Sequence, residues 1–168
     1  MGRMPVELNY QLFALFLVLL VVLFVKKDRF IPLFWPSFIW GFLADVVFVM
    51  FFGRWLGLFQ WVRTLPFDFY GSPVWVNFAW ILAMMLFFNF LPKRNGGYVR
   101  PLYFFAFALT AALIDQVFYH IGLLKYIRWS PFCRFATVLV WEILAAWNYT
   151  RLNPAEFRGR PERDSGKT

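Results

Sequence analysis

Residues 31–52 read IPLFWPSFIWGFLADVVFVMFF, and this stretch decides the fold. A helix rises about 1.5 Å per residue, so about 20 apolar residues cross the ~30 Å hydrocarbon core of a bilayer. The stretch is long enough, and its single charge is that of Asp45, well inside it. An ionised carboxylate at that depth is costly. The sequence therefore predicts a membrane-spanning helix in which another group of the protein holds Asp45.

Further apolar stretches accompany this one, with short basic connections between them. The chain of 168 residues is 61% hydrophobic and 24% aromatic, whereas a soluble domain is about half apolar. A membrane β-barrel would show alternating segments of about ten residues instead. We therefore predict an all-α fold, a polytopic transmembrane helical bundle of about five spans. The predicted spans cover residues 9–25, 31–52, 73–92, 101–124 and 135–149, and the last of them is short and could start within residues 131–133.

Residues 53–72 are too polar for a span of this kind. On a helical wheel one face collects Trp55, Leu58, Phe59, Val62 and Leu65, and the opposite face collects Gln60, Arg63 and Thr64. This pattern predicts an interfacial amphipathic helix that lies in the plane of the membrane surface. A re-entrant segment is the alternative. Pro66 would end the helix, and residues 70–73 predict a turn.

The distribution of Lys and Arg predicts the domains and the orientation. We expect a transmembrane helical domain at 1–150 and a disordered basic cytoplasmic tail at 151–168. Eleven of the 17 Lys and Arg residues lie in the 26–30 loop, the 93–100 loop and the tail, and six lie on the other side. The positive-inside rule then puts the N-terminus outside. The net charge of +8 suits anionic headgroups rather than nucleic acid. The expected partners are membrane lipids, and a homo-oligomer or a membrane partner protein.

Asp115 lies inside the fourth span much as Asp45 lies inside the second. Each is about 14 residues from the cytoplasmic start of its predicted span, roughly 21 Å deep, so the two acids share a level in the outer half. Arg54 or Arg63 could reach down from the interfacial segment to pair with a carboxylate. The predicted buried polar cluster consists of Asp45, Asn77, Asp115, Tyr119, His120, Glu142 and Arg63, with Gln116 beside them.

Three roles remain open for Asp45 and Asp115. They are structural groups that pair with Arg63 or with Trp and Tyr, a proton or cation site, or catalytic acids. The single cysteine, Cys133, excludes an intrachain disulfide, and with one His it disfavours zinc, although two Asp, a Glu and a His could hold another metal. The chain lacks a phosphate-binding loop and a His-Glu-x-x-His motif. We predict no cofactor and no metal.

The order and spacing of several short motifs carry a family resemblance across residues 40–135. They are Leu43-Ala44-Asp45, Trp61-Val62-Arg63, Leu65-Pro66-Phe67, Ile114-Asp115, Leu123-Leu124-Lys125-Tyr126 and Trp129. With them the chain resembles an uncharacterised family of small, aromatic-rich, polytopic membrane proteins of spore-forming Bacillota. The family usually has Glu, often two, around the later position, where this chain has Asp115 and then His120. The resemblance implies a bacterial cytoplasmic-membrane protein linked to sporulation, with no established reaction.

The leading functional prediction is a non-enzymatic integral membrane protein. Its buried acidic cluster shapes the bundle, and it binds a lipid or a membrane partner. The first alternative is a small proton, cation or solute transporter or channel, with Asp45, Asp115 and Glu142 along the path. The second is a lipid-modifying membrane enzyme in which Asp45 and Asp115 act as acid and base and Arg63 grips a headgroup.

Overall fold

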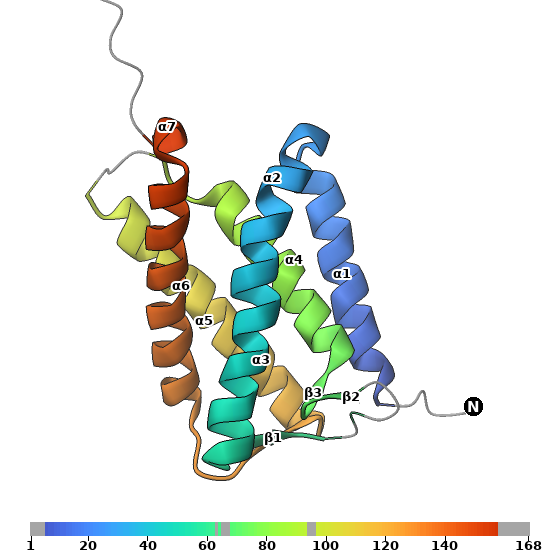
Figure 1. Ribbon diagram of the computed structural model, residues 1–168. Coiled ribbons are helices and arrows are strands. Elements are labelled where there is room, and N and C mark those ends of the chain that lie inside the picture. The colour runs from blue at the N-terminus through green and yellow to red at the C-terminus, as the bar shows by residue number, and fades with distance from the viewer. Residues whose placement is uncertain (1–5, 63, 65–67, 94–96, 158–168) are drawn as a thin grey trace, which may run out of the picture.

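The computed structural model describes residues 6–62, 64, 68–93 and 97–157. They are mostly helical, as predicted. The helices are α1 (Leu8–Phe24), α2 (Lys27–Ser37), η1 (Phe38–Leu43), α3 (Ala44–Phe48), η2 (Val49–Trp55), α4 (Val74–Phe90), α5 (Val99–His120), α6 (Pro131–Leu152) and α7 (Pro154–Phe157). The strands are β1 (Phe59–Trp61), β2 (Asp68–Phe69), β3 (Ser72–Pro73) and β4 (Leu124–Tyr126). The helices α1, α4, α5 and α6 lie side by side with the α2–η2 helix, as Figure 1 shows.

The segments from α2 to η2 form one continuous helix of 29 residues. It contains the predicted span 31–52 and begins a turn earlier, at Lys27, so Pro32 and Pro36 lie inside it. The segments η1 and η2 are π-helical, a geometry that usually occurs as short interruptions of an α-helix and often at functional sites. Asp45 lies in the short α-helical segment between them.

The core of the bundle is α4, which packs against α1, α2 and η1, while α5 packs against α6. Met84, Met85, Phe87 and Phe88 are each at most 1% exposed. In contrast, the buried residues of α1 recur every three or four positions and so form a single face, as expected for a helix with one packed side. Its buried residues are Tyr10, Ala14, Leu17 and Val21.

Within the described part of the chain, two helices are long and apolar enough to cross a membrane, Lys27–Trp55 and Val99–His120. In the most apolar segment of each helix, only 33% and 28% of the residues, respectively, are buried. Most residues of these segments therefore face outward. Helices α1 and α4 are apolar but shorter. The fifth predicted span, 135–149, lies within α6, which begins four residues earlier, at Pro131.

The predicted interfacial helix in residues 53–72 is wrong. After η2 the chain turns through Gly57, whose φ is +61°, and continues as β1. This strand pairs antiparallel with β4, Phe59 opposite Tyr126 and Trp61 opposite Leu124. Burial alternates along β1 with period two, so Phe59 of the predicted helix face points inward together with Trp61, which was not on that face, while Trp55 is exposed at the end of η2. The turn predicted at 70–73 is confirmed, because β2 and β3 form a hairpin there.

Tyr10 fastens the start of α1 to this sheet. It is 2% exposed, and its hydroxyl lies 2.8 Å from the carbonyl oxygen of Val62 and 2.7 Å from that of Leu123. Its ring packs against Trp61 and Phe118. We call this end of the bundle, with the four strands and the connection 121–130, the strand end. The opposite end, with α7 and the connections after α1 and α4, is the α7 end (Figure 1).

The prediction of a disordered tail from residue 151 is wrong for residues 151–157. Helix α6 continues through Leu152, and Pro154–Phe157 form α7. Glu156 of α7 forms ion pairs with Arg29 and Lys93, which fix this turn against the bundle. Residues 158–168 of the predicted tail lie outside the described residues.

Candidate functional site

Arg134 and Asp115 form a buried ion pair near the strand end. The Arg134 Nε atom lies 2.6 Å from Asp115 Oδ2, and the two residues are 5% and 6% exposed. Asp115 belongs to the face of α5 that also buries Ala108, Ala111 and Ala112. These small side chains let α6 approach closely, as is usual between helices in membranes.

The guanidinium of Arg134 also lies over two aromatic rings. Its Cζ atom is 5.1 Å from the ring centroid of Phe48 and 5.3 Å from that of Trp80. Both distances are within the ~6 Å range of cation–π attraction, which is strongest where the cation is desolvated. The side chain therefore joins α3, α4, α5 and α6.

Asp45 joins the same interior. It is 8% exposed and interacts electrostatically with both Arg134 and Asp115. All three side chains line one narrow gap beneath β1 and β4. We call Asp45, Asp115 and Arg134 the buried triad. The two acids that the sequence put at one depth therefore do come together, but on Arg134. Arg54 is exposed, and Arg63 lies outside the described residues.

Glu142 lies across a small cavity from the triad. The cavity measures about 30 Å³ and is bounded by Asp45, Arg134 and Glu142 among aromatic side chains. Glu142 is 1% exposed. Within the described part of the chain, neither of its carboxylate oxygens has a hydrogen-bond partner, and the same holds for Asp45 Oδ2. Such groups are unusual, because buried polar atoms are nearly always paired.

The prediction of a buried cluster is wrong for Tyr119 and His120, which are both exposed. The buried face of α5 passes through Asp115 and Phe118, and positions 119 and 120 turn away from it. The ring of Tyr119 stacks on that of Tyr126 at 5.0 Å.

Gln116 and Asn77 bond neighbouring side chains and not the triad itself. Gln116 Nε2 donates to the Tyr126 hydroxyl at 3.0 Å. Burial, with the negative charge of Asp115 nearby, raises the pKa of Tyr126 to about 12, so this hydroxyl stays neutral. Asn77 is fully buried, and its Oδ1 accepts from Ser72 Oγ at 2.8 Å. Asn77 thus fixes the start of α4 to β3.

Arg134 is the site residue that the sequence analysis missed, because it was assigned to the basic connection before the fifth span. The sequence does contain a signal for the earlier start of this helix. Ser130 caps α6 by accepting from the backbone N–H of Cys133 at 3.1 Å, and Pro131 follows in the first turn. Ser followed by Pro is a helix-start pattern, which would have placed Arg134 inside the helix.

An apolar groove of about 200 Å³ runs between α1 and α5 over the floor of α4. Phe16, on its rim, is 54% exposed, so the groove opens outward. The lining residues are Phe13, Phe16, Leu17, Leu20, Trp61, Val76, Ala79, Trp80, Ala83, Leu86, Phe107, Thr110, Ala111, Ile114, Asp115 and Phe118. We call this space the α1–α5 groove.

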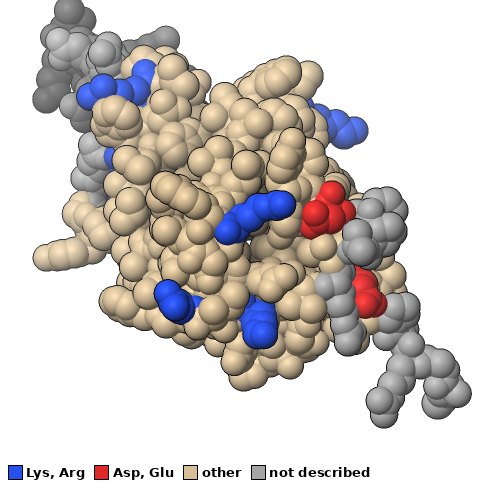
Figure 2. Space-filling view, turned by 60° about the horizontal axis from the view of Figure 1, so that its bottom comes forward, with Lys and Arg blue, Asp and Glu red and all other residues tan. Residues whose placement is uncertain are grey.

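The strand end carries a second hollow of about 300 Å³, lined by Arg54, Gln60, Tyr70 and apolar neighbours. Figure 2 turns this end forward and shows scattered Lys and Arg side chains on a mostly uncharged surface. Lys125 and Arg128 are exposed in the same region. This end therefore carries a few scattered positive side chains, with acidic ones at its edge, on a mostly uncharged surface.

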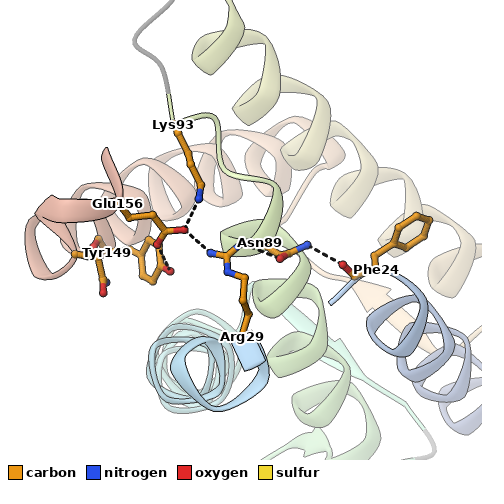
Figure 3. Close-up of polar contacts among 7 residues, drawn as sticks. Phe24, Arg29, Asn89, Lys93, Tyr149 and Glu156 are labelled. Carbon is orange, nitrogen blue, oxygen red and sulfur yellow. Dashed lines mark hydrogen bonds and ion pairs between the residues drawn. The ribbon is translucent and has the colours of Figure 1, made fainter. Parts of the chain in front are cut away.

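A polar network closes the α7 end (Figure 3). Glu156 Oε1 accepts from Arg29 and lies 2.8 Å from Lys93 Nζ, and the Tyr149 hydroxyl donates to Glu156 Oε2 at 3.1 Å. Arg29 also donates to Asn89 Oδ1 at 3.1 Å, and Asn89 donates to the carbonyl of Phe24 at 3.2 Å. The network ties α7 to α2, to α6 and to the end of α4.

The network predicts a small dependence of stability on pH. Burial alone would raise the pKa of Glu156, but the hydrogen bond from Lys93 and the charges of Arg29 and Lys93 outweigh it and lower this pKa below 4.5. The stabilisation is present above the unfolded-state pKa and is lost as the pH falls through the folded-state value. We expect acidification to lower the melting temperature more in the wild type than in Glu156→Gln, with a difference in the free energy of unfolding of about 1 kcal/mol or less. Equal acid sensitivity of the two proteins would contradict this.

Among the residues that the structure describes, no three His, Cys, Asp or Glu side chains are grouped closely enough to hold a metal ion. No family model, curated protein or solved structure matches this chain. Function must therefore be inferred from the buried triad, the cavity beside it and the α1–α5 groove.

Proposed function

We propose that the protein is a non-enzymatic, multi-pass membrane protein that holds one acyl chain of a membrane lipid in the α1–α5 groove. The observation that carries this proposal is the groove itself. It is larger than the ~150 Å³ engineered apolar cavity that stays dry and binds benzene. Its walls are apolar except for Thr110 and Asp115.

The outward faces of the helices support a membrane location. Val22, Ile31, Leu102 and Leu113 are between 57% and 72% exposed, on four different stretches of the bundle's surface. Large apolar patches on a soluble monomer are uncommon and mark interaction surfaces, whereas lipid tails are the natural surroundings of such faces. With α1, α2–η2, α4, α5 and α6 as spans, the chain crosses the bilayer five times.

The charge distribution supports a cytoplasmic α7 end. Arg134, one of the six basic residues counted on the opposite side, is buried in the bundle and contributes nothing to that surface. The excess of Lys and Arg on the side of α7 is therefore larger than the sequence count suggested. The positive-inside rule then places α7 in the cytoplasm and the N-terminus outside. The resemblance to proteins of spore-forming Bacillota favours a bacterial cytoplasmic membrane.

The buried triad favours a structural role for two of the acids over an enzymatic one. Asp115 is engaged by Arg134 at 2.6 Å, and the space beside Asp45 and Glu142 is only about 30 Å³. A lipid-modifying enzyme would need both carboxylates on a pocket wide enough for a headgroup. We infer that the triad instead fixes the helices that form the groove, whose wall includes Asp115.

An acyl chain would be retained in the groove by packing. Inside a bilayer there is no hydrophobic gain, because lipid tails are as apolar as the protein, so retention depends on van der Waals contacts. Ala83 lines the floor of the groove, and Leu at this position would fill part of it. Ala83→Leu should remove on the order of ten carbon–carbon contacts, at about 0.1–0.2 kcal/mol each. Retention should then weaken roughly five- to thirtyfold.

Native mass spectrometry of the purified protein with added phosphatidylglycerol measures this retention. We expect one retained phospholipid on the wild type, less on Ala83→Leu, and the wild-type amount on Ala106→Leu. Ala106 is an exposed residue of α5 that does not line the groove, so the control adds the same volume elsewhere. Equal retention by all three proteins, or a lipid-free dimer that Ala83→Leu dissociates, would overturn the proposal.

A further inference from the structure

Glu142 is a buried acid that neither the triad nor the groove uses. It lies near the middle of α6 and is 1% exposed, and within the described residues both its oxygens lack a hydrogen-bond partner. Leaving a carboxylate buried without a partner costs several kcal/mol. Such a residue inside a helical bundle is therefore a candidate for ligand binding.

The cavity beside Glu142 places a second carboxylate opposite it. Asp45 lines the same space, and its Oδ2 atom likewise has no partner in the described part of the structure. The volume of about 30 Å³ is close to that of a single water molecule. Asp45 and Glu142 thus line one small space, and three of their carboxylate oxygens have no hydrogen-bond partner in the described part of the structure.

The charges around the cavity do not balance. The charged residues that are buried in the described structure are Asp45, Asp115, Glu142 and Arg134. Arg134 is the single positive one among them, and it is 2.6 Å from Asp115. When ionised, the four carry a net charge of −2. A monovalent cation between Asp45 and Glu142 would halve this excess and give all three free oxygens a partner.

The cavity walls also suit a cation. Trp40, Trp80, Trp141 and Phe48 line it, and aromatic faces attract cations that shed their water readily. The Trp141 indole donates to the carbonyl oxygen of Trp40 at 3.1 Å, so these two walls are held in place.

We propose that this cavity binds one dehydrated monovalent cation, such as potassium or ammonium, between the carboxylates of Asp45 and Glu142. The proposal does not depend on lipid binding in the α1–α5 groove, because Asp45 and Glu142 line the small cavity and not the groove. A ligand that binds only the folded state raises stability by RT ln(1 + [L]/Kd). A cation at 100-fold its Kd should therefore raise the melting temperature by roughly 5–10 °C.

The test is the melting temperature of the purified full-length protein at mildly alkaline pH and constant ionic strength. Potassium chloride and ammonium chloride are each compared with N-methyl-D-glucamine chloride, whose cation is too large for the cavity. We expect stabilisation by one or both small cations in the wild type. Glu142→Gln and Asp45→Asn should lose it, and Asp28→Asn, which removes an exposed carboxylate of α2, should keep it.

Two outcomes would overturn the proposal. One is a wild-type melting temperature that is the same in all three salts, a result that needs no variant to fold. The other is an infrared carbonyl band of a neutral carboxylic acid that is unchanged by potassium or ammonium and disappears in Glu142→Gln, because Glu142 would then carry a proton instead. Cation stabilisation that persists in both Glu142→Gln and Asp45→Asn would place the site elsewhere.

Discussion

Replacing Arg134 with Met should destabilise the protein by about 3–5 kcal/mol, the usual cost of removing one partner from a buried ion pair. The substitution keeps an apolar side chain of similar length. It leaves Asp115, which is only 6% exposed, without the guanidinium that lies 2.6 Å from its carboxylate. The melting temperature in detergent should fall by roughly 6–20 °C. Arg128→Met is the matched control, because Arg128 is an exposed arginine of the same end and should shift the free energy of unfolding by about 0.5 kcal/mol or less.

A second variant identifies the cause of that loss. If the unpaired acid is responsible, adding Asp115→Leu to Arg134→Met should restore much of the stability, since buried ion pairs can often be replaced by apolar residues at little cost. The double-mutant cycle then gives a large coupling energy between the two positions. A double variant that is as unstable as Arg134→Met alone would show that the loss comes from the contacts with Phe48 and Trp80 instead.

Gly41→Ala should separate two helices that the wild type holds in backbone contact. A Cβ atom at Gly41 would lie 2.6 Å from the Trp80 carbonyl oxygen and 2.8 Å from the Ile81 Cα atom. Both neighbours are backbone of α4, which is the buried core of the bundle and cannot move aside easily. We expect a loss of about 1–3 kcal/mol or more from overpacking, measured as a lower melting temperature.

Gly53→Ala is the matched control for Gly41→Ala. Gly53 also lies in a π-helical segment of the same long helix, but a Cβ atom there would meet the Phe59 ring at an ordinary 3.5 Å. Alanine is intrinsically better than glycine in a helix by about 1 kcal/mol, so this variant should be neutral or more stable. Equal destabilisation by both substitutions would mean that the backbone conformation, and not the contact with α4, requires glycine.

The positions of the long helices could be predicted because an apolar run of this length directly indicates a helix. The two acids at a common depth followed from helix rise alone, and the structure brings Asp45 and Asp115 together in one gap. The partner could not be predicted as long as the start of α6 was placed at residue 135. That error moved Arg134 from the first turn of a helix to a solvent-facing connection and made Arg63 look like the better candidate.

The strand end could not be read from the sequence for a different reason. In Phe59-Gln60-Trp61 the apolar residues alternate over too few positions to separate a strand from one side of a helix. The pairing that decides between the two comes from β4, more than sixty residues later along the chain. Of the π-helical segments on either side of Asp45, η1 packs against α4 and η2 against β1, and no residue pattern in 31–52 indicates them.

The placement of the Tyr10 hydroxyl bears on how the chain is made. Its two acceptors, the carbonyl oxygens of Val62 and Leu123, belong to segments that leave the ribosome long after the first helix. A chain that enters a bilayer from its N-terminus therefore has its earliest helix in place before anything exists to which that helix can be fastened. The Tyr10 hydroxyl can donate to both carbonyl oxygens only after β1 and β4 have paired. The hydrogen bonds that fasten the first helix to be synthesised are therefore among the last to form. Premature termination before residue 123 should leave α1 packed on α4 but without the Leu123 acceptor of its Tyr10 hydroxyl, and such products are natural substrates for membrane quality control.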